Sequence, residues 1–394
     1  MKRKEYRLYN LALILLAVVF MVLTLKLSSN VGLGSLLSGI GANIFNDKSS
    51  GQTSTMACSD KAQLDIKTPA EPHLAKLQQY QGLCRSLAVS RLMIFTSFPH
   101  DAASAEELAS KDAAVLQAFH ESGVEPIVIV EPYIASGPMS YRAYLNGDHD
   151  VAVDAYFGGL RSKGIDDQKM GMWVPFPESN TPSWDNKDTE PKDFAYAVNR
   201  YLRAMKTQFP NTKGSILLNA TTYEPTDLEY DNGDYISLIP YLQDIDRSLV
   251  SSVGIQGFPW VSRASQPRRE IFRASEFLQP DYAVEAAKEL RTRDIWFNTG
   301  SFASKYTNDS QQRVELTNSD RKAVLTGILE ELKKIQTLQQ NEYRVMVNIF
   351  AQDKSATQEA TDWSYLGDSA AEMILREFLT EATKAGIDIA LYDK

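Results

Sequence analysis

Short apolar runs rich in β-branched residues recur along most of the chain and predict strands. Seven such runs begin at residues 92, 126, 170, 215, 252, 294 and 345: LMIFTS, PIVIV, MGMWVPF, SILLN, SVGIQ, DIWFN and VMVNIF. A weaker run, QLDIK from Gln63, predicts a strand before them, and IDIAL from Ile387 predicts an extra strand after them. Continuous apolar runs of this length are typical of strands that are buried on both faces.

Segments with a single apolar stripe at helical spacing lie between these runs. The first begins with a capping box from Ser104 to Glu107. Others cover 194–209, begin after Ser319, and run from Asp368 towards Gly386. Because each stripe is one helix face wide, each helix should pack on one side only, against a sheet.

Alternating strands and helices predict a closed (β/α)8 TIM barrel over residues 61–394. Eight strand and helix units over about 330 residues suit that fold. This count takes QLDIK as the first strand, so that MGMWVPF becomes the fourth and DIWFN the seventh. An open doubly wound sheet is the alternative, but no GxGxxG follows the first strands.

The N-terminal residues 1–27 predict a cytoplasmic basic flank and a transmembrane helix. The basic residues are Lys2, Arg3, Lys4 and Arg7. The apolar run from Leu11 to Leu25 is short of the length of about 20 residues that a bilayer requires, but Leu8 to Leu27 reaches it if Lys26 snorkels and Asn10 lies at the interface. Because basic flanks stay inside, the rest of the chain should be extracytoplasmic. No A-x-A site follows closely, which favours a retained signal-anchor over a cleaved signal peptide and a secreted protein.

Residues 28–60 are rich in Gly, Ser and Asn and predict a flexible stalk. The chain has only two cysteines, Cys58 and Cys84. Outside the cytoplasm they could pair, and the closed loop would contribute about 3 kcal/mol of stability. Two free thiols are equally compatible with the sequence.

Composition narrows the possible partners. With 43% hydrophobic and 23% charged residues, most of the chain should fold. Lys and Arg total 41 against 50 acidic residues, and the net charge of −9 argues against a nucleic-acid partner. The four histidines have no close ligand spacing and no CxxC pair exists, so we expect neither a metal site nor a cofactor.

Polar and aromatic residues follow the predicted strands, where a barrel carries its functional side chains. They are Glu131, Tyr133, Glu178, Asn180, Trp184, Glu224, Phe258, Trp260, Asn298, Asp353 and Trp363. Aromatic rings can cover the faces of sugar rings, while carboxylates and amides hydrogen-bond hydroxyl groups. The mixture therefore predicts a glycan cleft, with packing beneath long loops as the alternative.

The segment WVPFPESNTPSW, from Trp173 to Trp184, resembles the strand-four motif of glycoside hydrolase family 26, the β-mannanase family. VIVEPY, GIQGFPW, DIWFNTGS and IFAQDK with TDW are similar to that family's segments at strands three, six, seven and eight. HLAKLQQYQGLCRSLAVSRLMIFTSF looks like its first helix and second strand. The resemblance implies a clan A barrel that acts on or binds a polysaccharide.

The resemblance also implies a retaining mechanism with two glutamates, and it assigns Glu178 as the acid/base. Asn298 occupies the nucleophile position, and its neutral carboxamide cannot attack a sugar as a carboxylate does. Pro177 stands where the family has His, and Phe258 stands where it has Tyr. These departures imply that the usual retaining chemistry has been lost.

Three functions therefore remain open. The first is a membrane-anchored, extracytoplasmic glycan-binding protein, a pseudoenzyme. Its substrate-binding residues would be Glu131, Tyr133, Asn180, Trp184, Phe258, Trp260 and Trp363. The second is an active glycosidase on β-mannan or a related polysaccharide, inverting or substrate-assisted, with Glu178 as the acid. Its alternative base would be Glu131, Glu224 or Asp353. The third is a structural or partner-docking ectodomain.

Overall fold

The computed structural model describes residues 91–392 with some gaps. The gaps are 122, 135–136, 181–189, 221–237, 260–273, 307–312, 339–341, 352, 355–360 and 366. The predicted anchor 1–27, the stalk 28–60 and both cysteines lie outside the described residues, as does the QLDIK run. Within the described ranges, no helix has the length and apolar character needed to cross a bilayer.

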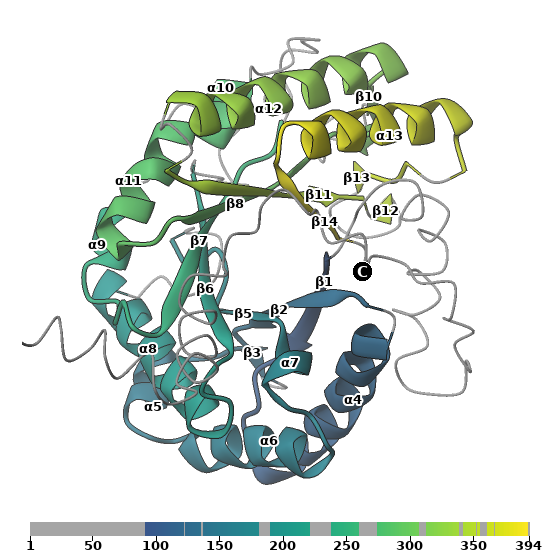
Figure 1. The fold of residues 1–394 in the computed structure, drawn as a ribbon. Helices are drawn as coiled ribbons and strands as arrows, with labels where there is room; N and C mark the ends of the chain where they lie inside the picture. Colours follow the sequence, from purple (N-terminus) through teal and green to yellow (C-terminus); the bar gives the residue numbers. More distant parts are fainter. Residues whose placement is uncertain are drawn as a thin grey trace, which may run out of the picture. The chain divides into compact units, whose positions relative to one another are not determined.

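Eight parallel strands close into a barrel in the described part of the chain. In chain order they are β1 (Arg91–Ser97), β2 (Glu125–Glu131), β5 (Met172–Pro175), β6 (Lys213–Asn219), β7 (Val250–Gln256), β8 (Asp294–Gly300), β11 (Arg344–Phe350) and β14 (Asp388–Tyr392). Figure 1 shows the strands as an inner ring with the helices outside it. The prediction of a parallel sheet curled into a barrel is therefore confirmed.

The IDIAL run, which was expected to be an extra strand, is β14 and completes the ring. It pairs with β1, where Ala390 lies opposite Arg91, and with β11 on its other side. The barrel thus closes without QLDIK, and the predicted strand numbers are wrong by one. MGMWVPF supplies the third strand rather than the fourth, and DIWFN supplies the sixth rather than the seventh. An apolar run identifies a strand but does not identify its neighbours.

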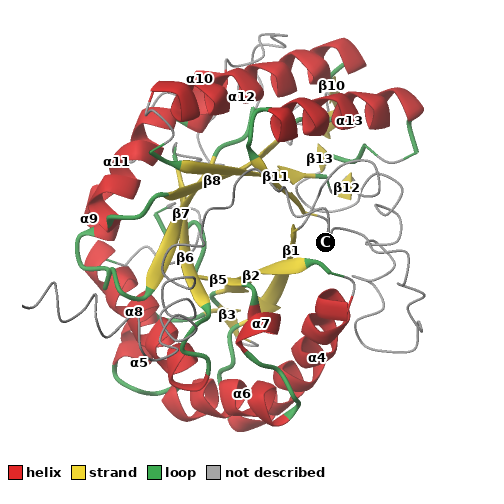
Figure 2. Ribbon diagram, in the orientation of Figure 1, coloured by secondary structure: helices red, strands yellow, loops and turns green. Residues whose placement is uncertain are grey.

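Helices cover the outside of the barrel, as Figure 2 shows in red around the yellow strands. Those in the described residues are α4 (Ala102–Glu121), α5 (Tyr141–Leu145), α6 (Asp150–Ser162), α7 (Asp167–Met170), α8 (Pro191–Gln208), α9 (Ile239–Leu242), α10 (Ala274–Leu278), α11 (Pro280–Leu290), α12 (Asn318–Leu338) and α13 (Ser369–Lys384). The side chain of Asp368 caps α13, which begins where the sequence predicts.

The capping box of α4 lies one turn earlier than predicted. The backbone N–H of Ser104 donates to Asp101 Oδ1 at 2.7 Å, and the N–H of Asp101 donates to Ser104 Oγ at 3.0 Å. Ser104 therefore takes the later position in a box with Asp101 rather than the first position in a box with Glu107, and the helix gains a turn.

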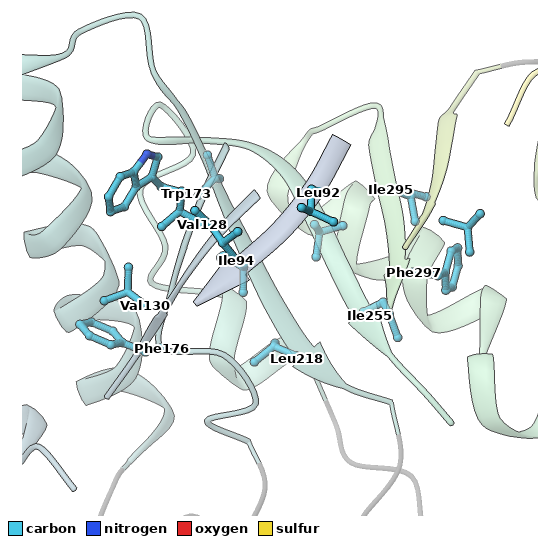
Figure 3. Packing of buried hydrophobic residues seen from close by; sticks show 14 of the residues in the cluster. Leu92, Ile94, Val128, Val130, Trp173, Phe176, Leu218, Ile255, Ile295 and Phe297 are labelled. Carbon is cyan, nitrogen blue, oxygen red and sulfur yellow. The ribbon is translucent and has the colours of Figure 1, made fainter. Parts of the chain in front are cut away.

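Side chains alternate along each strand between two apolar cores. The outward residues of the strands pack against the helices, and Figure 3 shows part of this core, including Leu92, Ile94, Val128, Trp173 and Phe297. The inward residues fill the barrel itself, among them Met93, Ile129, Val174, Leu217 and Trp296. The barrel interior is thus packed mainly with apolar side chains.

Ion pairs occupy the N-terminal end of the barrel. Arg91 Nε lies 2.8 Å from a carboxyl oxygen of Glu125, and Arg344 Nε lies 2.5 Å from one of Asp294. These residues start neighbouring strands and tie them together. Polar residues at this end of a barrel serve stability, so the candidate site is sought at the opposite, C-terminal end.

Two small sheets lie in the loops that follow the barrel strands. β3 (Tyr133–Ile134) and β4 (Gly137–Pro138) form a hairpin after β2. The other sheet has the order β10-β9-β13-β12 and consists of β9 (Ser304–Tyr306), β10 (Arg313–Glu315), β12 (Asp353–Lys354) and β13 (Thr361–Asp362). It joins the loop after β8 to the loop after β11.

Candidate functional site

A strained turn after β5 carries Glu178. Phe176 and Glu178 have φ angles of 56° and 58°, in the left-handed region that non-glycine residues seldom adopt. The turn is fixed from both sides, because the N–H of Phe176 donates to Val130 O and the N–H of Glu178 donates to Leu217 O, each at 2.9 Å. These carbonyls belong to β2 and β6, so the neighbouring strands impose the conformation. Strain of this kind is concentrated at functional sites.

The Asn180 side chain fastens the end of this turn to β6. Its Nδ2 donates to Asn219 O at 2.7 Å, and its Oδ1 accepts from Asn219 N at 2.9 Å. Only 4% of Asn180 is exposed. The structure therefore gives Asn180 a role in holding the turn, in place of the predicted contact with a sugar.

Tyr141 supports the same turn from α5. Its hydroxyl lies 2.5 Å from Ser179 Oγ, which in turn donates to Phe176 O at 2.8 Å. Burial raises the pKa of Tyr141, so its phenol stays neutral. Glu178 thus projects from a turn that is held at several points.

Glu178 accepts a hydrogen bond from Gln256, the last residue of β7. The Nε2 of Gln256 donates to Glu178 Oε1 and also to Asn219 Oδ1, the latter at 3.0 Å. Glu178 and Gln256 are both half-buried, whereas Asn219 is 7% exposed. This group combines a carboxylate with carboxamides at the C-terminal ends of β5, β6 and β7, where a barrel carries its chemistry.

Two further carboxamides continue from Gln256 into the barrel. Asn298 Nδ2 donates to Gln256 Oε1 at 2.6 Å, and Asn348 Nδ2 donates to Asn298 Oδ1 at 2.5 Å. The strand register explains this contact, because Asn298 on β8 lies opposite Gln256 on β7 and opposite Asn348 on β11. Four side chains, one on the turn after β5 and three on the adjacent strands β7, β8 and β11, are thus hydrogen-bonded in series.

The assignment of Asn298 to the nucleophile position is not confirmed by its surroundings. Asn298 lies on the sixth strand of the ring rather than the seventh, is 4% exposed, and is hydrogen-bonded at both ends of its carboxamide. It is connected to Glu178 through Gln256. Its assignment to the nucleophile position is therefore not supported by the strand order.

Trp363 lies in the core instead of offering an open face to a sugar. It is 1% exposed, and its ring centroid lies 5.0 Å from that of Phe258, 5.4 Å from Phe302 and 5.5 Å from Phe350. The prediction of an exposed aromatic surface at Trp363 is wrong, because β13 folds the preceding residues back against β9. Phe258 is partly buried against the same cluster.

Of the remaining predicted residues, only Glu131 and Tyr133 have side chains in the described part of the structure. Glu131 ends β2 and is half-buried, and Tyr133 is 37% exposed on β3. Asp353 begins β12, but its side chain lies outside the described part of the structure. Trp184, Glu224 and Trp260 lie outside it altogether.

Sequence reasoning missed Asn219, Gln256 and Asn348. Each is a polar residue at the end of, or inside, an otherwise apolar strand. That pattern is the signal that could have identified them. Within the described residues, no cluster of three His, Cys, Asp or Glu side chains could hold a metal ion.

The chain matches no protein-family profile and no curated protein. Solved structures are similar to it in fold. A family 1 β-glucosidase from Thermotoga maritima has a TM-score of 0.50 at 10% identity, covering 80% of this chain and 87% of that chain. An endo-β-1,4-mannanase from Thermotoga petrophila has a TM-score of 0.46 at 12% identity, covering 77% of this chain and 72% of that chain.

The exo-β-1,4-mannosidase Op5Man5 from Opitutaceae bacterium strain TAV5 has a TM-score of 0.48 at 12% identity, covering 75% of this chain and 54% of that chain. Identities this low indicate a shared fold and no more. The protein therefore has an α/β fold whose curled parallel sheet resembles that of TIM-barrel glycoside hydrolases.

Proposed function

We propose that the protein is a membrane-anchored, extracytoplasmic glycan-binding protein that recognises a polysaccharide at the C-terminal end of its barrel. The anchor is the apolar segment within 1–27, the stalk is 28–60, and the barrel domain is 61–394. The observation that carries the proposal is the placement of Glu178 by a strained turn beside the carboxamide of Gln256. Carboxylate and carboxamide groups are suited to hydrogen-bond sugar hydroxyls.

Binding without the usual retaining chemistry accounts best for the groups around Glu178. A retaining glycosidase needs a second carboxylate about 5 to 5.5 Å from the first. The side chains that the structure joins to Glu178 in series are the carboxamides of Gln256 and Asn298, which are not nucleophiles of that kind. They serve recognition, because each can donate and accept hydrogen bonds.

The strand order favours a second candidate function, an active glycosidase. The family resemblance assigns the acid/base to strand four and the nucleophile to strand seven. In the closed ring these strands are β6 and β11. The carboxylates that follow them are Glu224 and Asp353. In this alternative they carry the chemistry on β-mannan or a related polysaccharide, and Glu178 contacts the substrate.

Affinity electrophoresis of the full chain in mild detergent tests the proposal. Gels containing β-mannan, β-glucan or an amino-sugar polymer should retard the protein, and the polymer should keep its chain length. Glu178→Gln and Trp184→Ala should weaken the retardation. The matched control is Tyr196→Ala, an exposed aromatic residue on α8 outside the barrel, which should change nothing.

The other outcomes separate the two candidate functions. Shortening of a polymer that Glu224→Gln or Asp353→Asn abolishes would replace the binding proposal by the glycosidase. A folded protein that neither binds nor cleaves any of these polymers would refute both.

A further inference from the structure

We infer that Asn298 and Asn348 are positioning residues that orient the Gln256 side chain and, through it, the carboxylate of Glu178. The inference deepens the proposed function and rests on it, because it concerns how the glycan-binding carboxylate of Glu178 is oriented before any glycan binds. Neither residue can touch a glycan directly, since Asn298 is 4% exposed and Asn348 is fully buried.

The direction of the hydrogen bonds carries the argument. A carboxamide has nearly the same shape in its two orientations, but one end donates and the other accepts. Asn348 donates to Asn298, Asn298 donates to Gln256, and this leaves the amide of Gln256 to donate to Glu178. If Gln256 turned over, its carbonyl oxygen would face the carboxylate and repel it. Asn298, together with Asn219, whose Oδ1 also accepts from Gln256 Nε2 at 3.0 Å, thus selects the useful orientation of Gln256.

Stability alone does not account for these buried amides. The interior around them is apolar, with Met93, Trp296 and Met346 in the same cluster. Asn348 Oδ1 is buried and accepts no hydrogen bond within the described part of the chain. A buried acceptor without a donor destabilises a fold, whereas an apolar pair of similar volume would not. The relay formed by Asn348, Asn298 and Gln256 therefore has a use other than packing.

Neighbouring carboxamides also reinforce one another. Hydrogen bonds in series polarise each other, so each donor in the run strengthens the next. Here every donor points towards Glu178. The series holds the carboxylate in one rotamer, ready to accept hydrogen bonds from sugar hydroxyls.

The first experiment reads the Gln256 side chain in the free protein, without any glycan. The full chain is labelled with ¹⁵N-glutamine, and the amide signals of Gln256 are identified by their loss in Gln256→Leu. Asn298→Asp keeps an acceptor for Asn348 but removes the donor to Gln256, so the Gln256 side chain should lose its fixed orientation and its two signals should shift. Unchanged signals in Asn298→Asp would overturn the inference.

Asn199→Asp is the matched control for this substitution. Asn199 is also 4% exposed, on α8, and bonds Asp244 O and Asp246 N away from the relay. It should destabilise the protein without moving the Gln256 signals. A shift of equal size in this control would mean that the signals report general loosening, which would also count against the relay.

The second experiment separates positioning from structure. Asn298→Leu combined with Asn348→Leu removes both buried carboxamides at similar volume. We expect the unfolding temperature to stay the same or rise, while affinity for β-1,4-mannan falls about tenfold, as expected when a hydrogen bond to a charged group is lost. Unchanged affinity, or a loss that follows destabilisation, would contradict a positioning role. If the unaltered protein binds no mannan, the proposed function fails for that polymer, and the amide signals alone decide the relay.

Discussion

The hydroxyl of Tyr156 donates to a carboxyl oxygen of Asp112 at 2.6 Å. Thr96 donates to the same oxygen at 2.6 Å, so a carboxyl group from α4 joins β1 to α6 behind the barrel wall. Burial raises the pKa of Asp112 above its ordinary value, and the two hydrogen bonds offset only part of that rise. The folded protein therefore holds this proton more tightly than the unfolded chain does.

Asp112→Asn should make the free energy of unfolding less sensitive to pH. In the unaltered protein, the contribution of the protonated carboxyl is complete below the unfolded pKa of 3.8 and is lost as the pH rises through the higher folded pKa. As the pH rises from about 4 to about 8, the unfolding temperature of Asp112→Asn should therefore rise relative to that of the unaltered protein. Asp368→Asn is the control. Hydrogen bonds from Asn318 and from the amides of Ala370 and Ala371 lower the pKa of Asp368 below 3.8. Its contribution is therefore complete above that pH, and the difference between Asp368→Asn and the unaltered protein should stay constant from about pH 4 to about pH 8. A constant difference for Asp112→Asn across this range would contradict the burial argument.

Gly254→Ala should destabilise the barrel, because a Cβ at this position would lie 2.2 Å from Trp296 Cε2. The two residues are direct partners in the pairing of β7 with β8. The indole must move or the strands must separate, and overpacking of this kind costs about 1–3 kcal/mol. Gly158→Ala on α6 has open space around it and should raise stability by about 0.5–1 kcal/mol. Denaturant unfolding compares the free energies of unfolding of the two variants. Equal effects would show that the Trp296 indole moves aside without cost.

Tyr201→Phe should leave the free energy of unfolding unchanged or raise it. The Tyr201 hydroxyl is buried and has no hydrogen-bond partner within the described part of the structure. Removing it therefore relieves an unpaired polar group. The same substitution at Tyr156 removes the donor to Asp112 and should lower stability by about 1–3 kcal/mol. Calorimetry on the two variants compares them, and a loss at Tyr201 as large as at Tyr156 would show that its hydroxyl is bonded.

Glu178→Gly should stabilise the fold and abolish glycan binding. Glycine adopts a φ of 58° without the strain of about 1–2 kcal/mol that a left-handed conformation imposes on other residues. Arg291→Gly is the control, because Arg291 ends α11 with a φ of 55° and lies away from the site. Both variants should unfold at a higher temperature, but only Glu178→Gly should lose retardation in a glycan gel. A stabilised Glu178→Gly that still binds would remove Glu178 from the site.

The apolar runs located the barrel strands, but they could not give their order around the ring. IDIAL and QLDIK are similar in length and pattern, yet the first is β14, with which the described strands close the ring, and the second lies outside the described residues. Which run pairs with β1 depends on the path of the chain in three dimensions and not on local periodicity. The error of one in the strand count then displaced the roles that the resemblance assigned to Glu178 and Asn298.

Within the site, residues at strand ends could be predicted, and their partners could not. The family resemblance, together with its position after an apolar run, identifies Glu178, but Gln256 and Asn348 give only the weak signal of a polar residue in a strand. Their importance comes from the register that brings three strands level at Asn298. For a related reason, the sequence could not show that Trp363 is buried. Its burial becomes visible only in the structure, where β13 pairs with β9.

The closure of the ring by β14 has a consequence for the protein during its synthesis. β1 ends at Ser97 and its partner begins at Asp388, so 290 residues separate them. At a synthesis rate of about 5–20 residues per second, the edge of β1 stays unpaired for roughly 15–60 s until β14 is made. A strand edge with unpaired backbone groups is a template for aggregation. The edge of β1 is therefore a site of aggregation until β14 pairs with it.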